Sequence, residues 1–284
     1  MRQVVFSIIL MALVVPVQAD EAADLLAKQK KAVEAALAAV QLPPQPVVES
    51  PNLLLAGPLS EARLKALSAT LEKQYAAAIK ALQFEGSEKP LPGKLAVYVF
   101  DDRTKYRSFV RAVAKASPDD DEQARQLIKG DTPFVAVGPG RSKDSPAPEA
   151  QAGYQVAIAL LGVRTRNAPL PEWASLGFAK ATAYQASGAS GGARKKGARD
   201  IVARRGRVAD LWSDKLSAEQ KLALGTSVMD FLVYGKGVPK PIDVISAMRP
   251  EEEKVMKSAE DVFGAVKMTP DQFEAVFLKW LRAN

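Results

Sequence analysis

Residues 95–100 read LAVYVF, and this uncharged stretch decides the fold class. Its valine, tyrosine and phenylalanine side chains are typical of a strand buried in a sheet. Weaker patterns of the same kind at 49–56 (ESPNLLLA) and 133–138 (PFVAVG) predict two further strands. Because helical segments separate these strands, we expect the N-terminal half to contain a small mixed β-sheet with helices around it.

The segments between and after the strands repeat their apolar residues with a helical period. Ser60 is placed to cap the helix between the first two strands, with Glu61 in its first turn. The clearest helix is the last, where Thr269 and Gln272 form a capping box around Pro270. After the third strand only helices are predicted, at 150–163, 173–184, 217–235, 250–266 and 270–282. The sequence therefore predicts an α+β domain with a mostly helical C-terminal half.

The N-terminus predicts export. Arg2 precedes an apolar run at 4–15, and the small-residue site VQA at 17–19 follows it, as in a secretory signal peptide. We expect residues 1–19 to be removed, leaving a periplasmic or extracellular protein without a membrane span. Residues 20–46 then form a helix and a stiff proline-rich linker (LPPQP) before a domain at 47–284. The linker allows this helix to stand apart from the domain, and the sequence leaves its docking open.

Composition removes whole classes of chemistry. The chain has 284 residues and a formal net charge of +7, but it contains no histidine and no cysteine. This excludes Ser-His-Asp and Cys-His catalysis, disulfides, and zinc sites built from histidine or cysteine. Any activity must therefore rely on carboxylates, amides, hydroxyls, lysine and arginine.

Five segments, taken together and in order, carry a resemblance over about residues 48–282. They are ESPNLLLAGPLSEARLKALSATLEKQYAAAI, LAVYVFDDRTKYRSFV, LPEWASLGFAKATAYQ, SVMDFLVYG and FEAVFLKWL. As an ordered set they resemble the peptidase MA-like family of exported, gluzincin-type zinc metallopeptidases. In that family a His-Glu-x-x-His helix supplies two zinc ligands and the general base, and a glutamate on the following helix is the third ligand.

The resemblance implies that this zinc site has been lost. Tyr154 and Ile158 stand at the histidine positions, Gln155 replaces the general base and Leu176 replaces the third ligand. Isoleucine and leucine cannot bind zinc, a phenol is a poor substitute for imidazole, and an amide cannot act as the base. We therefore expect a gluzincin-like pseudo-peptidase without metal or cofactor, acting as a binding or structural module for an unknown protein or peptide. Whether the former cleft is open or plugged is not decided by the sequence.

A second hypothesis is an electrostatic adaptor that binds anionic envelope polymer through a basic stretch at 194–207. No aromatic residue is interleaved in this stretch, so nucleic-acid binding by base stacking is not expected. The possible anion-binding residues are Arg194, Lys195, Lys196, Arg199, Arg204, Arg205 and Arg207.

A third hypothesis is a hydrolase of unrecognised mechanism. Ser175 and Lys180 are a candidate pair, but side chains five apart on a helix point about 140° away from each other. The acidic turn at 117–122 (SPDDDE) lacks the glycine and the distant glutamate of an EF-hand loop, so we expect a solvated loop there rather than a calcium site. The sequence does not determine the oligomeric state.

Overall fold

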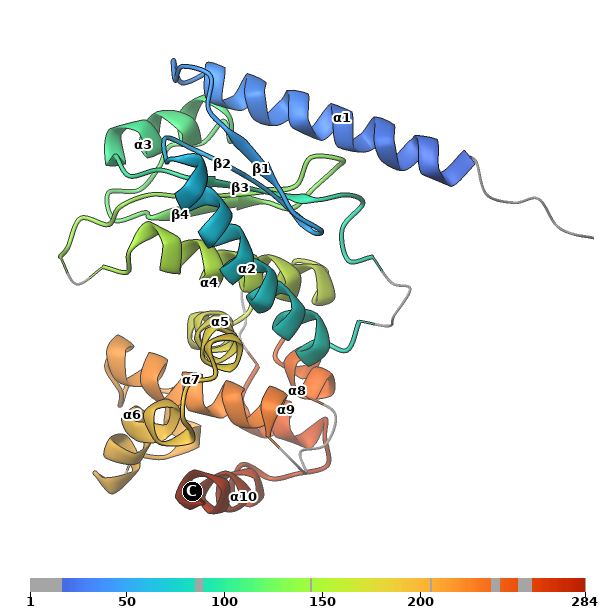
Figure 1. Cartoon of the computed structure of the whole chain (residues 1–284). Helices are drawn as coiled ribbons and strands as arrows, with labels where there is room; N and C mark the ends of the chain where they lie inside the picture. The colour runs from blue at the N-terminus through green and yellow to red at the C-terminus, as the bar shows by residue number, and fades with distance from the viewer. Residues whose placement is uncertain are drawn as a thin grey trace, which may run out of the picture.

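The computed structural model describes residues 17–84, 89–143, 145–204, 206–235, 241–249 and 257–283. The predicted signal peptide lies outside these residues except for 17–19, which begin helix α1 (Val17–Ala38). No helix within the described ranges is long and apolar enough to cross a membrane. The α+β fold class predicted from the sequence is confirmed, with a small mixed sheet followed by helices (Figure 1).

A five-stranded sheet forms the centre of the N-terminal half, in the order β1-β2-β3-β5-β4. The three inner strands are parallel, and both edge strands run antiparallel to their neighbours. The strands are β1 (Val47–Glu49), β2 (Leu53–Ala56), β3 (Leu95–Val99), β4 (Ala124–Leu127) and β5 (Phe134–Val137).

Two strand predictions need correction. The segment 49–56, predicted as one strand, is split between two antiparallel strands, because the chain turns at 50–52 between β1 and β2. Strand β4 was not predicted at all. Its sequence, ARQL, has no apolar alternation, and its residues are half-buried or exposed, so the pattern that identifies a buried strand is missing.

Helices cover both faces of the sheet. In Figure 1, α1 and α3 (Arg103–Ala112) lie on one face, and α2 (Glu61–Ala81) and α4 (Pro148–Arg164) lie on the other. Strand residues alternate between two separate apolar clusters, with Leu53 and Leu55 on the α2 side and Leu54 on the α1 side. This alternation explains why the inner strands are apolar at every position: both faces are buried.

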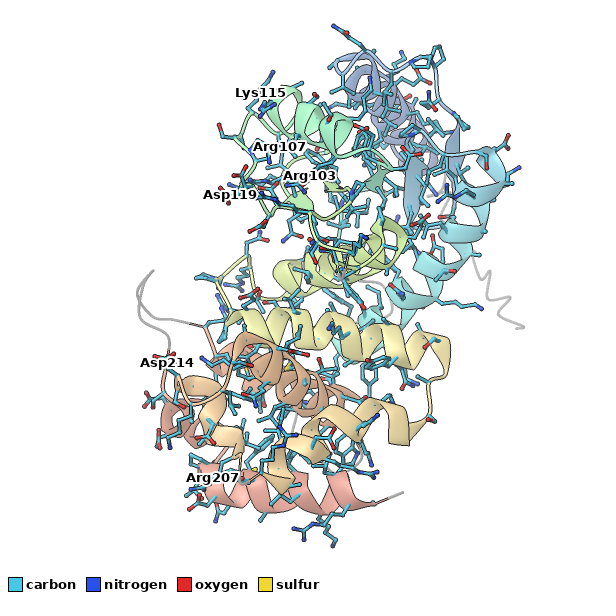
Figure 2. The ribbon with its side chains drawn as sticks, turned by 90° about the vertical axis from the view of Figure 1, so that its left-hand side faces the viewer. Arg103, Arg107, Lys115, Asp119, Arg207 and Asp214 are labelled. Atoms are coloured by element: carbon cyan, nitrogen blue, oxygen red, sulfur yellow. The ribbon has the colours of Figure 1, made fainter. Side chains whose placement is uncertain are left out.

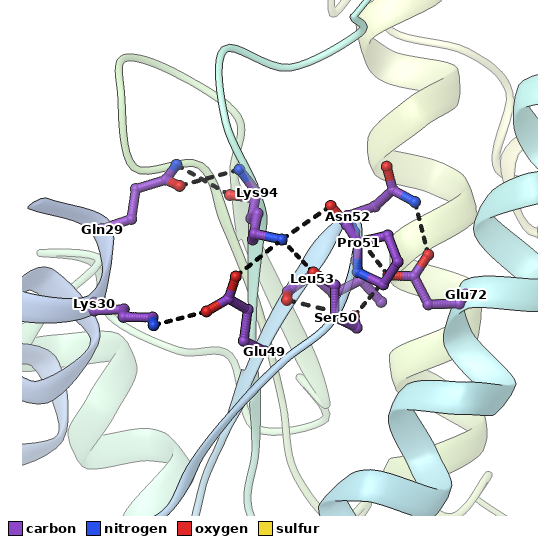
Figure 3. Close-up of polar contacts among 9 residues, drawn as sticks. All are labelled: Gln29, Lys30, Glu49, Ser50, Pro51, Asn52, Leu53, Glu72 and Lys94. Carbon is purple, nitrogen blue, oxygen red and sulfur yellow. Dashed lines mark hydrogen bonds and ion pairs between the residues drawn. The ribbon is translucent and has the colours of Figure 1, made fainter. Parts of the chain in front are cut away.

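Helix α1 docks on the sheet, which the sequence had left open. Its residues Val33 and Leu37 are buried in the α1-side cluster. Gln29, only 3% exposed, accepts a hydrogen bond from the Lys94 backbone N–H and donates to two carbonyls (Figure 3). Lys30 forms an ion pair with Glu49 of β1 at 2.7 Å. The proline-rich linker therefore connects α1 to the sheet on which this helix packs.

The C-terminal half consists of short packed helices. Helices α5 and α7 approach most closely, because a Cβ on Gly177 would lie 2.8 Å from the Gly225 carbonyl oxygen. The capping box predicted at Thr269 and Gln272 is present at the start of α10. The helices are α5 (Glu172–Ser187), α6 (Gly191–Ala203), η1 (Val208–Trp212), α7 (Ala218–Tyr234), α8 (Pro241–Ala247), α9 (Ala259–Gly264) and α10 (Pro270–Arg282).

The helix predicted at 250–266 appears in the structure as the shorter α9, and its part at 250–256 lies outside the described residues. Helix α8 was not predicted. It has only seven residues, too few for a helical period to be recognised.

Candidate functional site

The four positions that the resemblance aligns with a zinc site lie on two neighbouring helices. Tyr154, Gln155 and Ile158 are on α4, and Leu176 is on α5. Gln155 is buried, with 9% of its surface exposed, whereas the other three side chains are half-buried. Tyr154 and Ile158 also pack against the main core. The site is therefore partly filled, and it keeps an accessible surface at three of its four positions.

Zinc does not fit these positions. Ile158 and Leu176 carry no donor atom, and Gln155 offers only an amide. Within the described residues there is no group of three or more histidine, cysteine, aspartate or glutamate side chains that can hold a metal ion. No metal-assisted step is therefore derived for this site.

Two ionisable groups near this site have shifted pKa values. Burial raises the pKa of the Tyr154 phenol, and the neighbouring Tyr184 adds to the effect. Burial lowers the pKa of Lys180, while Glu219 acts in the opposite direction. The Tyr154 phenol therefore titrates further from neutral pH than a free phenol does, and no hydrogen bond joins Ser175 to Lys180 in the structure. The Ser175–Lys180 pair is therefore not assembled.

A hollow of about 250 Å³ lies where α4, α5 and the edge strand β4 meet. Of the four aligned positions only Ile158 lines it, together with Ser175 of α5 and Gln126 of β4. The remaining walls come from the C-terminal part of α4 and the α4–α5 connection: Leu161, Gly162, Thr165, Asn167, Ala168, Pro169 and Leu170. This wall is mixed, with polar and apolar groups in about equal share, so the hollow suits a small or medium uncharged side chain better than a charged one. We call it the β4 hollow.

The outer edge of β4 is available beside this hollow. Among the described strands β4 ends the sheet, so only β5 pairs with it. Gly138 N–H donates to the Gln123 carbonyl at 2.9 Å, which makes these two residues a hydrogen-bonded pair. Such pairs alternate in an antiparallel ladder, so Arg125 is also bonded to β5, while Ala124 and Gln126 turn their N–H and C=O groups outward. No sequence pattern predicts these outward N–H and C=O groups, because every residue type carries the same backbone groups.

The basic stretch at 194–207 is largely used inside the protein. Lys195 is only 5% exposed, and its Nζ donates to the carbonyls of Trp280 and Ala283 at 2.7 and 2.8 Å. Arg199 donates to the Leu281 carbonyl at 3.0 Å. These bonds satisfy carbonyls at the C-terminal end of α10 with positive charge, which favours the helix.

Two more cations of this stretch form ion pairs. Arg194 binds the buried Asp230 at 2.9 Å, and Arg207 binds Glu274 and Asp271 of α10. Lys196 and Arg204 are exposed, and Arg205 lies outside the described residues. The prediction of an anion-binding surface built from all seven cations is therefore corrected, because four of them already have internal partners.

The acidic turn at 117–122 is held by arginines of α3. Arg107 donates to the carbonyls of Pro118 and Asp119 at 3.3 and 2.9 Å. Glu122 accepts hydrogen bonds from Tyr106 and from Arg125. The turn is therefore a structural loop attached to α3 and β4.

Another hollow, of about 420 Å³, lies under α1 and next to the turn of β1 and β2. Of its lining residues, Lys89 is exposed. Asn52 donates to Glu72 (Figure 3), and Glu49 binds Lys30 and Lys94. Together these cations lower the pKa of Glu49. This hollow therefore offers few free polar groups to a ligand.

No protein-family model matches the chain, and no curated protein is similar to it.

Proposed function

We propose that this chain is an exported, catalytically inactive protein of the gluzincin type, and that it binds an extended peptide along the edge of β4. The observation that carries the proposal is the pair of outward-facing residues Ala124 and Gln126 beside the 250 Å³ hollow. An added strand satisfies unpaired N–H and C=O groups, and a pocket beside it selects alternate side chains. In this geometry the peptide residue opposite Gln126 places its side chain in the hollow.

The chemistry of the cleft supports binding without cleavage. Hydrolysis of a peptide bond needs an activated water or nucleophile and a group that stabilises the oxyanion. The former base position holds an amide, Gln155, and two former ligand positions hold hydrocarbon side chains, Ile158 and Leu176. We therefore expect the bound peptide to leave the cleft intact.

The proposal is tested with a library of random nine-residue peptides displayed on phage. The wild type is expected to enrich peptides, and Gln126→Pro is expected to abolish their binding because proline removes the outward N–H. Gln126→Ala is the matched control, since it removes the same side chain and keeps the N–H. If Gln126→Pro binds the enriched peptides as well as Gln126→Ala does, the proposal is wrong.

A second measurement does not depend on the variant folding. Each backbone amide of one enriched peptide is methylated in turn, and its binding to the wild type is measured. Because alternate amides of a paired strand face the partner, methylation is expected to abolish binding at every second position within the bound segment. Loss without this alternation argues against strand addition. Mass spectrometry of the incubated peptide is expected to show no cleavage, and cleavage would contradict the inactive assignment.

A further inference from the structure

A second hollow lies near the other end of β4, and arginines line it. It has a volume of about 290 Å³ and is open to solvent. Arg103 and Arg107 come from α3, Arg141 from the loop after β5, and Asp120 from the turn before β4. Figure 2 shows Arg103 and Arg107 together beside Asp119, far from Arg207 in the helical half. We call these four lining residues the arginine hollow.

Hydrogen bonds to main-chain carbonyls hold two of the guanidinium groups in place. Arg103 donates to the carbonyls of Asp120 and Pro139, and Arg107 donates to those of Pro118 and Asp119. These acceptors are uncharged, so they orient the arginines without neutralising them. Placing fixed guanidinium groups around a solvent-filled hollow is the usual arrangement for binding a carboxylate or another oxyanion.

The charge of the arginine hollow is incompletely balanced. Asp120 is the one carboxylate in its lining; it lies 3.5 Å from Arg107, and its side chain is 83% exposed. The nearby Glu122 is engaged by Arg125. Arg141 is exposed and forms no ion pair with any residue that the structure describes. The lining therefore contains three guanidinium groups and one exposed carboxylate, so an incoming anion can bind without displacing a buried pair.

The position of the arginine hollow relates it to the strand edge. Asp120 precedes β4 by a few residues, and Arg141 follows the residues that pair with the start of β4. Arg103 and Arg107 come from α3 and Ile158 from α4, so the two hollows lie on opposite faces of the sheet. Side chains of an extended peptide alternate between the faces, so a peptide with one residue in the β4 hollow presents the residue three positions away, about 10 Å along the chain, to the face of the arginine hollow.

We propose that the peptide bound along β4 carries an aspartate or glutamate three residues from the residue that fills the β4 hollow, and that its carboxylate binds in the arginine hollow. This inference rests on the proposed function, because it names the class of peptide that the same edge selects. Charge complementarity then fixes the register of a backbone contact that by itself tolerates any sequence.

The test is an aspartate scan of one enriched peptide whose own acidic residues have been replaced by alanine. Aspartate is placed at each position in turn, and the Kd for the wild type is measured at low salt by fluorescence polarisation. Affinity is expected to rise about fivefold at one position, three residues from the hollow-filling residue, and to return to baseline when that aspartate is changed to asparagine.

Arg141→Gln is the variant of choice, because Arg103 and Arg107 also hold the acidic turn. It is expected to flatten the scan, whereas Lys143→Gln, the same charge change two residues away in the same loop, leaves the peak in place. A flat scan on the wild type, or equal loss in both variants, overturns this inference. Strand addition is judged separately by Gln126→Pro and by peptide methylation, so the two proposals fail on different results.

Discussion

The basic stretch at 194–207 and the edge strand β4 show opposite relations between sequence and surface. The basic stretch has the densest positive charge of the chain, yet Lys195, Arg199 and Arg194 turn toward α10 and Asp230. Strand β4 has an unremarkable sequence, yet its outer backbone groups have no partner strand among the described elements. Charge in a sequence shows what a segment can bind, and only the tertiary structure shows whether the partner is already inside the protein.

The physical reason lies in the main chain. Both regions contain backbone groups that their own helix or sheet does not satisfy: C=O groups at the end of α10, and N–H and C=O groups at the edge of the sheet. At the end of α10 the carbonyls receive donors from α6 of the same chain. At β4 the corresponding donors must come from outside. The comparison is tested by removing the Lys195 donor, and by testing which β4 residues form hydrogen bonds with β5 and which face outward.

The largest effect is expected for Lys195→Met. This substitution leaves the carbonyls of Trp280 and Ala283 without their donor and removes the cation 4.2 Å from the Trp280 ring centre. We expect the free energy of unfolding to fall by about 3 kcal/mol in urea denaturation. Lys196→Met, the same change at an exposed neighbour, is expected to stay within about 0.5 kcal/mol of the wild type. Equal effects at the two positions would restore the basic stretch as a solvated binding surface.

A smaller effect is expected from proline in β4. Arg125→Pro removes a ladder bond to β5 and is expected to cost about 2 kcal/mol beyond Arg125→Ala. Gln126→Pro removes only an outward N–H, so its cost beyond Gln126→Ala is expected to be below about 1 kcal/mol. Urea denaturation of the four variants measures both differences. The reverse order would mean that Gln126, and not Arg125, is bonded to β5, and would remove the basis of the proposed peptide site.

The smallest effect is a pH dependence at the ion pair of Arg194 and Asp230. Burial raises the pKa of Asp230 above its ordinary value of 3.8, although Arg194 and Lys195 oppose the change. A raised folded-state pKa means that the folded protein holds the proton more tightly than the unfolded chain. The stability of the wild type relative to Asp230→Asn is therefore expected to rise as the pH falls from 7 toward 3.8.

This pH dependence is measured as the difference between the two denaturation series, which cancels groups common to both proteins, such as Glu49. A difference that falls toward low pH would show that Arg194 dominates over burial. The ion pair would then stabilise the folded state mainly through its charge.

The apolar pattern was sufficient to predict the main elements. LAVYVF became β3, PFVAVG became β5, and the capping box at Thr269 begins α10. These predictions succeeded because burial on both faces, or a local hydrogen bond, requires a recognisable pattern of residues within a short segment. The predictions failed at the turn within 49–56, at β4 and at α8, because strand pairing and a very short helix require no such local pattern. The resemblance singled out Tyr154, Gln155, Ile158 and Leu176 as a set, and of these only Ile158 lines the β4 hollow.

The sequence by itself determined the α+β class and the chemistry that the chain lacks, because the absence of histidine and cysteine does not depend on folding. The tertiary structure decided which polar groups are satisfied. It turned most of the basic stretch inward, docked α1 on the sheet, and left β4 at the edge between the β4 hollow and the arginine hollow. Hydrogen-bond partners distant in the chain are fixed by strand order and helix packing, and no local pattern encodes them.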